Sequence, residues 1–323
     1  MNMNYVHFII TRFNLPIFKR RDNNEKVDNC NLSFLQERLE IFEKCCFPSI
    51  ANQSCQNFKW LVLFDSKTPQ VIKNRLSALH GKYKNLLPCY LDVEAYDIGS
   101  EVYVDKYKAY YKKLKDVITP PISDYDGIDY YTKCQYIIQP QFVHDMILRN
   151  IPSDVDYDYI VTTRLDNDDA LHRDYVQTIQ TFVTRDARKV MYNFLYGYQL
   201  NLNNGIVQKY YYPNSHFTTL VESKKDVFLS AFYGDHRFVN VLHEVVNISM
   251  KPMWCELLHG KNVANTISVS YKNRILGGYL SFRNSDFGYT DVCVHFKDTI
   301  RFLTKISTIL SLLRSIKHGM LGL

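Results

Sequence analysis

Three aspartates lie within four positions, directly after a run of strand-forming residues. Asp166, Asp168 and Asp169 follow the segment Ile160–Arg164, whose β-branched residues are typical of a buried strand. Carboxylates this close repel one another and raise each other's pKa, so a divalent cation that prefers oxygen ligands commonly stabilises them. Mg²⁺ in such sites is often held by one or two carboxylates together with substrate phosphates. The cluster therefore predicts a divalent-cation site and a phosphate-bearing substrate.

The same acids also have a purely structural explanation. Asp168 or Asp169 would cap a helix whose apolar stripe runs from Ala170 to Phe182, because acids complement the dipole at a helix N-terminus. We favour the ligand site, since ligands of α/β sheets bind at the carboxyl ends of strands. A calcium loop beginning at Asp154 is excluded, because neither its glycine nor its bidentate glutamate is present at the required position.

The first third of the chain alternates between strand and helix patterns. The expected strands are Tyr5–Thr11, Phe58–Phe64 and Leu87–Val93. One helix is expected to begin at a capping box of Ser33 and Gln36 and to stop before Pro48, and another to begin with Thr68 as N-cap and Pro69 at the first helical position. This alternation predicts βαβ units with right-handed crossovers and a mainly parallel sheet.

The polar residues that follow the expected strands form the strongest signal for a site. Arg12 to Asn14, Asp65 and Asp166 to Asp169 each come at the end of a predicted strand. Because the carboxyl ends of parallel strands meet at one edge of a sheet, we expect these side chains to gather there.

The second half predicts antiparallel additions to the sheet. Extended residues are expected at Lys189–Asn193, and Asn204-Gly205 is a hairpin signal between Tyr196–Asn201 and Ile206–Tyr212. A helix is expected after Asp235, with an apolar stripe from Phe238 to Val245.

Composition favours a globular protein that binds small anions over one that binds nucleic acid. The 323 residues carry a formal net charge of +6 and a pI of about 8.7, which is mildly basic. The basic, tyrosine-rich segment Tyr103–Leu114 is interpreted as a solvated helix face, because no nucleic-acid motif accompanies it. Eight scattered cysteines without a C-x-x-C pair, and no apolar N-terminal run, predict free thiols and a cytoplasmic location.

The last residues form a separate feature. Asp298–His318 has apolar residues at helical spacing with Lys and Arg beside them, so we expect one main domain over 1–297 and an amphipathic tail over 298–323. Two roles stay open for this tail, which are packing against the domain and contact with the anionic inner face of a membrane.

Four stretches in this order resemble a known family. They are I-I-T-R-F-N (Ile9–Asn14), F-P-S-I-A-N-Q with F-K-W-L-V-L-F-D (within Phe47–Asp65), T-T-R-L-D-N-D-D-A-L (Thr162–Leu171) and W-C-E-L-L-H-G-K-N-V-A-N (Trp254–Asn265). The set is similar to the bacterial Putative rhamnosyl transferase family, and the third stretch resembles the D-x-D motif of glycosyltransferases with the GT-A fold. The resemblance implies an α/β, GT-A-like, Rossmann-type mixed sheet that is mainly parallel with antiparallel additions and has helices on both faces.

The resemblance also implies a function and a set of site residues. It implies a hexosyltransferase that moves a sugar, rhamnose in the family's name, from a nucleotide-sugar donor to a polysaccharide or glycolipid acceptor with the help of Mn²⁺ or Mg²⁺. The implied metal ligands are Asp166, Asp168 and His259, with Asp169 as a supporting ligand or cap. The implied donor-binding residues are Thr11, Arg12, Asn14, Asp65, Arg164 and Asp166.

If the reaction inverts the sugar's configuration, a carboxylate must deprotonate the acceptor hydroxyl. Asp235 is our first choice for this base, with Glu256 and Glu222 as alternatives. Two other classes of protein stay open. A metal-dependent nucleotidyltransferase would use the same acids, but the phosphate loop it normally needs near the first strand is missing from T-R-F-N-L-P. A non-catalytic carbohydrate-binding or scaffold protein would have no need of the acids.

Overall fold

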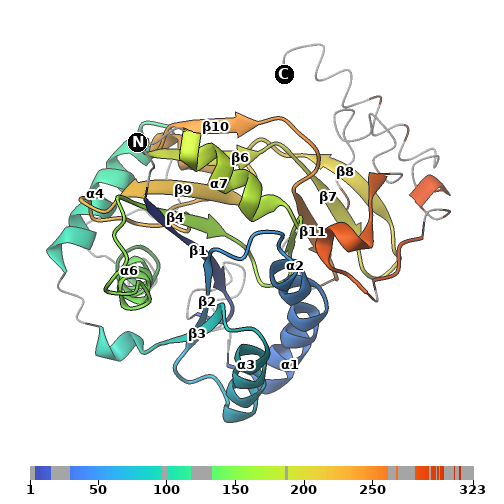
Figure 1. Cartoon of the computed structure of the whole chain (residues 1–323), viewed down its shortest axis with the longest axis horizontal. Coiled ribbons are helices and arrows are strands. Elements are labelled where there is room, and N and C mark those ends of the chain that lie inside the picture. The colour runs from blue at the N-terminus through green and yellow to red at the C-terminus, as the bar shows by residue number, and fades with distance from the viewer. Residues whose placement is uncertain are drawn as a thin grey trace.

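The computed structural model describes residues 4–15, 30–96, 100–117, 133–185, 188–260, 281–290 and 292–295, together with 299–301 and a few single positions between 267 and 313. A seven-stranded sheet in the order β10-β6-β9-β4-β1-β2-β3 forms its centre (Figure 1). The strands are β1 (Tyr5–Arg12), β2 (Lys59–Asp65), β3 (Leu86–Leu91), β4 (Tyr159–Arg164), β6 (Val190–Phe194), β9 (Thr218–Ser223) and β10 (Val245–Ile248). Strands β1 to β4 are parallel, and β9 is antiparallel to both of its neighbours. The predicted mixed, mainly parallel sheet is confirmed.

A smaller sheet of four strands lies beside the central one, in the order β5-β11-β7-β8. Its strands are β5 (Ala170–Leu171), β7 (Tyr196–Asn201), β8 (Val207–Tyr211) and β11 (Trp254–Leu258). The hairpin predicted at Asn204-Gly205 is confirmed, with Gly205 at a φ of 65° that suits a residue without a side chain. However, this hairpin belongs to the smaller sheet. Of the extended segments predicted in the second half, only Lys189–Asn193 enters the central sheet, as β6, which is antiparallel to β9.

Helices cover both faces of the central sheet, as predicted (Figure 1). One face carries α1 (Leu32–Ile41), η1 (Phe42–Cys46), α2 (Phe47–Ala51), α3 (Gln70–Lys82) and α7 (Tyr175–Arg185), and the other carries η3 (Cys134–Ile138) and α6 (Gln139–Arg149). Successive side chains of β1 point to opposite faces of the sheet and so pack against different helices. Ile9 packs under α1 and α3, whereas Phe8 and Ile10 pack under α6.

Two predicted helix starts are displaced by one or two residues. Asn31, and not Ser33, caps α1, because its side chain accepts a hydrogen bond from the backbone N–H of Phe34 at 3.1 Å. At α3 the capping position is taken by Pro69, while the Thr68 hydroxyl donates to the carbonyl of Asp65. Both helices therefore follow their strands as predicted, but a different residue occupies the N-cap position of each.

The expected stop before Pro48 is wrong, because the helix continues through a π-helical segment. In η1 the N–H of Phe47 donates to the carbonyl of Phe42, five residues earlier, and α2 follows directly with Pro48 in its first turn. The wider π turn removes the clash between a proline ring and the preceding turn of an α-helix. The same order recurs at η3, which directly precedes α6 with Pro140 in its first turn.

Two further helix predictions are corrected by strand pairing. Ala170 and Leu171 form β5, which pairs with Cys255 and Trp254 of β11, and the helix begins only at Tyr175. Asp168 and Asp169 therefore cap no helix. After Asp235 the helix is a short 3-10 segment, η4 (His236–Val241), and the expected end of its stripe lies in β10.

The tyrosines of the basic segment belong to the interior. In α4 (Glu101–Lys115), Tyr103, Tyr107, Tyr110 and Tyr111 are buried, so their rings are not available to stack on bases. The remaining short helical segments are η2 (Val93–Ala95) and η5 (Asn284–Phe287). All eight cysteines are free thiols.

The predicted amphipathic tail, Asp298–His318, falls almost wholly outside the described residues. The boundary between 1–297 and 298–323 and the proposed membrane contact therefore stay predictions. Among the described residues, no helix combines the length and the apolar character that crossing a bilayer requires.

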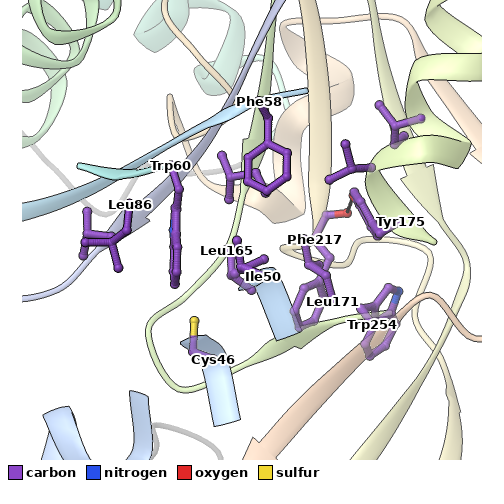
Figure 2. Close-up of a cluster of buried hydrophobic side chains, with 14 of the residues drawn as sticks. Cys46, Ile50, Phe58, Trp60, Leu86, Leu165, Leu171, Tyr175, Phe217 and Trp254 are labelled. Atoms are coloured by element: carbon purple, nitrogen blue, oxygen red, sulfur yellow. Dashed lines mark hydrogen bonds between the residues drawn. The ribbon is translucent and has the colours of Figure 1, made fainter. Parts of the chain in front are cut away.

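The two sheets share a packed seam around Trp254 (Figure 2). The Trp254 ring is fully buried and stacks on Phe217 with centroids 4.7 Å apart and planes inclined by 10°, and its N–H donates to the carbonyl of Phe194 at 2.8 Å. Gly197 of β7 lies against the indole. A Cβ atom added at Gly197 would come within 2.1 Å of two indole carbons.

Gly197→Ala is therefore expected to lower the free energy of unfolding by about 3 kcal/mol, at the upper end for overpacking of a rigid core. Gly81→Ala in α3 is the matched control, because a Cβ there meets nothing within 4 Å and a helical alanine stabilises by about 0.5–1 kcal/mol. Urea unfolding of both variants measures the difference. Equal stabilities would contradict this view of the seam.

Candidate functional site

The polar ends of three parallel strands meet at one edge of the central sheet, as predicted. The side-chain amide of Asn167, just past β4, donates to the carbonyl of Phe13, just past β1, at 3.0 Å. The Asn14 side chain accepts from the N–H of Asp65, at the end of β2, at 3.3 Å. These contacts bring the acidic cluster and the other two strand ends into one site.

Asp168 lies in a three-residue contact with side chains from two other elements. Arg38 Nη1, from α1, donates to Asp168 Oδ2 at 2.6 Å. His259 Nε2, directly after β11, lies 3.0 Å from the same oxygen and 3.1 Å from Arg38 Nη1. The predicted ligands Asp168 and His259 are thus brought together, with a cation against both of them.

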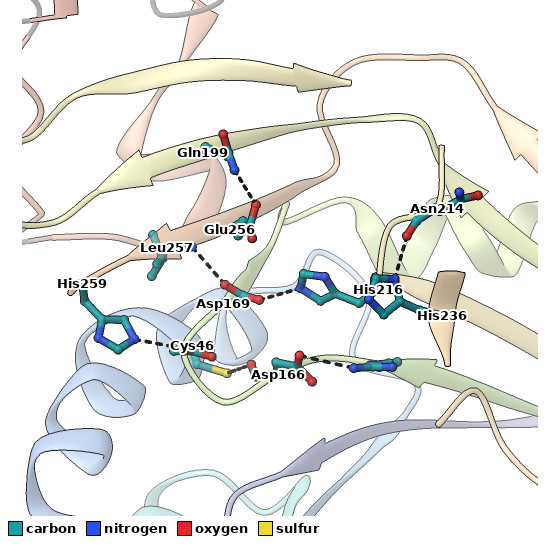
Figure 3. A network of polar contacts seen from close by, with 12 residues as sticks. Cys46, Asp166, Asp169, Gln199, Asn214, His216, His236, Glu256, Leu257 and His259 are labelled. Atoms are coloured by element: carbon teal, nitrogen blue, oxygen red, sulfur yellow. Dashed lines mark hydrogen bonds and ion pairs between the residues drawn. The ribbon is translucent and has the colours of Figure 1, made fainter. Parts of the chain in front are cut away.

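Asp169 forms a second pair, with a histidine that the sequence did not single out (Figure 3). His216 Nε2 lies 2.8 Å from Asp169 Oδ2, and Asp169 Oδ1 accepts from the N–H of Leu257 in β11 at 2.9 Å. Asp166 joins this pair, since ligand atoms of Asp166, Asp169 and His216 all lie within 4.8 Å of one another, close enough to share an ion.

Burial and neighbouring charges shift the pKa values of the three carboxyl groups in different directions. Burial raises the pKa of Asp166 and Asp168, but nearby cations outweigh it, so both stay below the ordinary value. The pKa of Asp166 is lowered by the charges of Arg164, His216 and Arg12. The pKa of Asp168 is lowered by a hydrogen bond from His259 and by the charge of Arg38.

Asp169 behaves in the opposite way. Burial and the neighbouring carboxylates of Asp168 and Glu256 raise its pKa to about 7, although His216 opposes the rise. Burial alone would lower the pKa of His216, but the hydrogen bond with Asp169 raises it. Asp169 and His216 therefore act as one unit that titrates together and neutralises itself.

Two arginines share one aromatic ring beside Asp166. The guanidinium carbons of Arg12 and Arg164 lie 4.6 Å and 4.9 Å from the centre of the Phe232 ring. Arg164 Nη2 lies 3.4 Å from Asp166 Oδ2, and its buried Nε has no hydrogen-bond partner within the described part of the chain. Two positive charges held this close are suited to an anion with more than one negative charge.

The candidates for a catalytic base differ in their surroundings. Asp235 caps η4 and forms a bidentate ion pair with Arg237, with contacts of 3.0 Å and 2.5 Å, which lowers its pKa despite partial burial. Glu256 of β11 lies beside Asp169 and accepts one hydrogen bond, from the neutral amide of Gln199 at 2.8 Å (Figure 3). Of the two, Glu256 is the carboxylate that no cation neutralises in the described structure.

Glu222 lies away from the cluster. It pairs with Ile160 near the start of β4, and its carboxylate accepts from the backbone N–H groups of Leu229 and Ser230 at 3.0 Å and 2.9 Å. Ser230 has a φ of 70°, an uncommon conformation for a side-chain-bearing residue. Glu222 thus stabilises a strained loop away from the acidic cluster.

The predicted donor-binding residues of β1 and β2 fall into two groups, one in the core and one at the edge of the sheet. Thr11 is fully buried, and its hydroxyl accepts from the Trp60 N–H at 3.0 Å, so this side chain belongs to the core. Asn14 and Asp65 are largely buried at the sheet edge, where Asp65 Oδ1 accepts from the N–H of Lys67 at 2.7 Å. Asn14 and Asp65 hold the strand ends together next to the cluster.

Two residues of the site, Arg38 and His216, were missed from sequence. Arg38 lies 130 positions before its partner Asp168, on a helix whose pattern shows only a polar face. His216 directly precedes a buried β-rich run, which is the one local signal that places it at the edge of the sheet.

A family model described as Putative rhamnosyl transferase matches residues 7–119 and 125–271 of the chain. No curated protein matches. Among solved structures, TarS of S. aureus is similar over 79% of this chain and 37% of its own, at 10% identity and a TM-score of 0.38. The TarS 1–349 structure with UDP is similar over 79% and 61%, at 10% identity and 0.37, and mouse xyloside xylosyltransferase 1 over 58% and 52%, at 12% identity and 0.28. The chain thus spans between about a third and about three fifths of the length of these structures.

Proposed function

Because the chain belongs to the Putative rhamnosyl transferase family, we propose that it transfers a sugar from a nucleotide-sugar donor to a glycan or lipid-linked acceptor, with the help of Mn²⁺ or Mg²⁺. One observation supports this most directly. The acidic cluster lies at the carboxyl ends of parallel strands, beside the paired cations of Arg12 and Arg164. A metal diphosphate needs carboxylate ligands on one side and cations for its phosphates on the other.

Two carboxylate–histidine pairs are candidates to hold a divalent cation together with Asp166. Among the described residues, only Asp169 and His216 already have ligand atoms within 4.8 Å of those of Asp166. Asp169 and His216 already neutralise each other, and Asp169 Oδ1 is committed to the backbone of β11. Asp168 and His259, in contrast, lie together against a positive group. We therefore assign Asp166, Asp168 and His259 as the ligands and Asp169 with His216 as their support. A divalent cation held by these residues would supply Lewis-acid neutralisation of the leaving diphosphate.

The two histidines give a direct test of this assignment. In the Mn²⁺-loaded wild type, pulsed electron paramagnetic resonance should detect a nitrogen hyperfine coupling from a coordinated imidazole. We expect His259→Gln to lose the coupling and His216→Gln to keep it, since only the first removes a ligand. Loss in His216→Gln with retention in His259→Gln would instead assign the Asp166, Asp169 and His216 group.

The remaining residues of the sheet edge receive roles in binding the donor. Arg12 and Arg164 would pair with the diphosphate, with Phe232 holding their guanidinium planes in place. Asn14 and Asp65 would border the nucleoside, since both lie at the ends of the neighbouring strands. A bound diphosphate would give the buried Nε of Arg164 a hydrogen-bond partner, which the described residues do not supply.

Glu256 is the base that this arrangement favours. An inverting transfer needs an unpaired carboxylate near the reacting sugar, and Glu256 lies beside the cluster with one neutral partner. Asp235, our first choice from sequence, is held by Arg237. The sugar named by the family is rhamnose, and we propose rhamnose as the group transferred.

Donor binding can be measured before any acceptor is known. Thermal unfolding with dTDP-, UDP- or GDP-sugars and Mn²⁺ should raise the melting temperature for one donor and only when the metal is present. Stabilisation by a free sugar without metal would favour a carbohydrate-binding scaffold. Release of pyrophosphate from a sugar phosphate and a nucleoside triphosphate would favour a nucleotidyltransferase.

A further inference from the structure

Arg38 takes the place of a cation between two groups that bind metals. Its Nη1 lies 2.6 Å from a carboxylate oxygen, Asp168 Oδ2, and 3.1 Å from an imidazole nitrogen, His259 Nε2. The two partner atoms lie only 3.0 Å from each other. A divalent ion bound to both would gather the same two atoms, and in this structure the guanidinium of Arg38 lies against both of them.

The positions of the three residues in the fold make this contact specific. Arg38 comes from α1, Asp168 from the loop between β4 and β5, and His259 from the end of β11. A guanidinium is always charged and only donates hydrogen bonds. The positive charge of Arg38 therefore lies beside Asp168 Oδ2 and His259 Nε2, the two atoms that would hold the metal.

The surroundings give Arg38 room to leave. Its side chain is 20% exposed, more than those of Asp168 and His259, at 12% and 4%. A pocket beside it is lined by Phe34, Glu37, Arg38, Ile41 and His259. The Phe34 ring lies 5.7 Å from the guanidinium carbon, and Glu37 supplies a carboxylate on the same pocket. A displaced guanidinium would thus meet an aromatic face and a negative charge.

We propose that Arg38 is a built-in counter-ion for the metal site, which holds Asp168 and His259 in place before the divalent cation arrives and is displaced when it binds. The inference rests on the proposed metal-dependent transfer. Removal of Arg38 would take a positive charge away from two metal-binding groups that lie 3.0 Å apart. When Arg38 is present, a free metal ion must compete with its positive charge for Asp168 and His259. The metal therefore binds best together with a donor, because the donor's diphosphate attracts the released guanidinium.

The proposal predicts that removing the guanidinium strengthens the binding of metal alone. Arg38→Gln should bind Mn²⁺ about tenfold more tightly than wild type in the absence of donor, because one charge-assisted hydrogen bond no longer competes. Arg38→Met, whose apolar side chain can pack against Phe34 and Ile41, should behave in the same way even if the glutamine variant folds poorly. Electron paramagnetic resonance of free Mn²⁺ measures both affinities.

The control is Arg75→Gln, which removes a surface ion pair with Glu43 and should leave Mn²⁺ affinity unchanged. The donor-dependent part of the proposal predicts that a nucleoside diphosphate strengthens Mn²⁺ binding more in wild type than in either Arg38 variant. Mn²⁺ binding by wild type, with unchanged or weaker binding by both Arg38 variants, would overturn the role of Arg38 alone. No Mn²⁺ binding by wild type or variants, with or without the diphosphate, would contradict the metal-dependent transfer itself.

Discussion

Asp168→Asn is expected to lower metal-dependent release of nucleoside diphosphate by about 10³-fold, equivalent to about 4 kcal/mol in the transition state. The substitution removes the carboxylate that would bind the metal and leaves the positive charge of Arg38 in place. The site would then repel the cation that it is proposed to hold. The large effect follows from this double change.

The control for this variant is Asp156→Asn. Asp156 is an exposed carboxylate that pairs with Lys224 at 3.2 Å, so its amide should release the diphosphate at the wild-type rate. Circular dichroism would establish that both variants are folded. Release within threefold of wild type by a folded Asp168→Asn protein would remove Asp168 from the metal site.

Glu256→Gln should lower the turnover of sugar transfer by about 10²- to 10⁴-fold, the usual contribution of a positioned general base. The amide has the same shape and can still pair with Gln199, but it cannot take a proton from the acceptor hydroxyl. Mn²⁺ affinity and donor stabilisation should stay unchanged, since Glu256 is not a proposed ligand. Steady-state kinetics with a known acceptor, together with thermal unfolding, separates the two properties.

Asp235→Asn is the comparison that makes this result specific. Its carboxylate is neutralised by Arg237 and caps η4, so we expect some loss of stability and less than about tenfold loss of turnover. The opposite order, with Asp235→Asn inactive and Glu256→Gln active, would transfer the role of base to Asp235. Two active variants would argue against a carboxylate base and for retention of configuration.

The sheet and the position of the acidic cluster could be predicted because both depend on local patterns. Local sequence indicates where these strands end, through the β-branched run before Asp166 and the polar residues after β1 and β2. Parallel neighbouring strands place such ends at the same edge of the sheet. The pairing of the acids could not be predicted. Arg38 and His216 reach Asp168 and Asp169 across 130 and 47 positions, through contacts that only the folded chain defines.

The errors in the helices have two physical causes. At Ala170 and Val245, pairing with β11 and β6 overrode a helical spacing of apolar residues. At Pro48 a π turn accommodated a residue that usually ends a helix. At Ala170 and Val245, hydrogen bonds to distant strands decided the structure, and at Ala170 they also shaped the site, because Asp169 accepts from the backbone of β11.

The measurement that tests the central claim most directly is Mn²⁺-dependent release of nucleoside diphosphate by the wild-type protein from dTDP-, UDP- and GDP-sugars, with and without a glycan or lipid-linked acceptor. The account predicts release from one donor, dependent on the metal and faster with the correct acceptor. Release that is unaffected by removal of the metal with a chelator would contradict the proposed site. Absence of both release and donor-dependent stabilisation for every donor would contradict the proposed transferase.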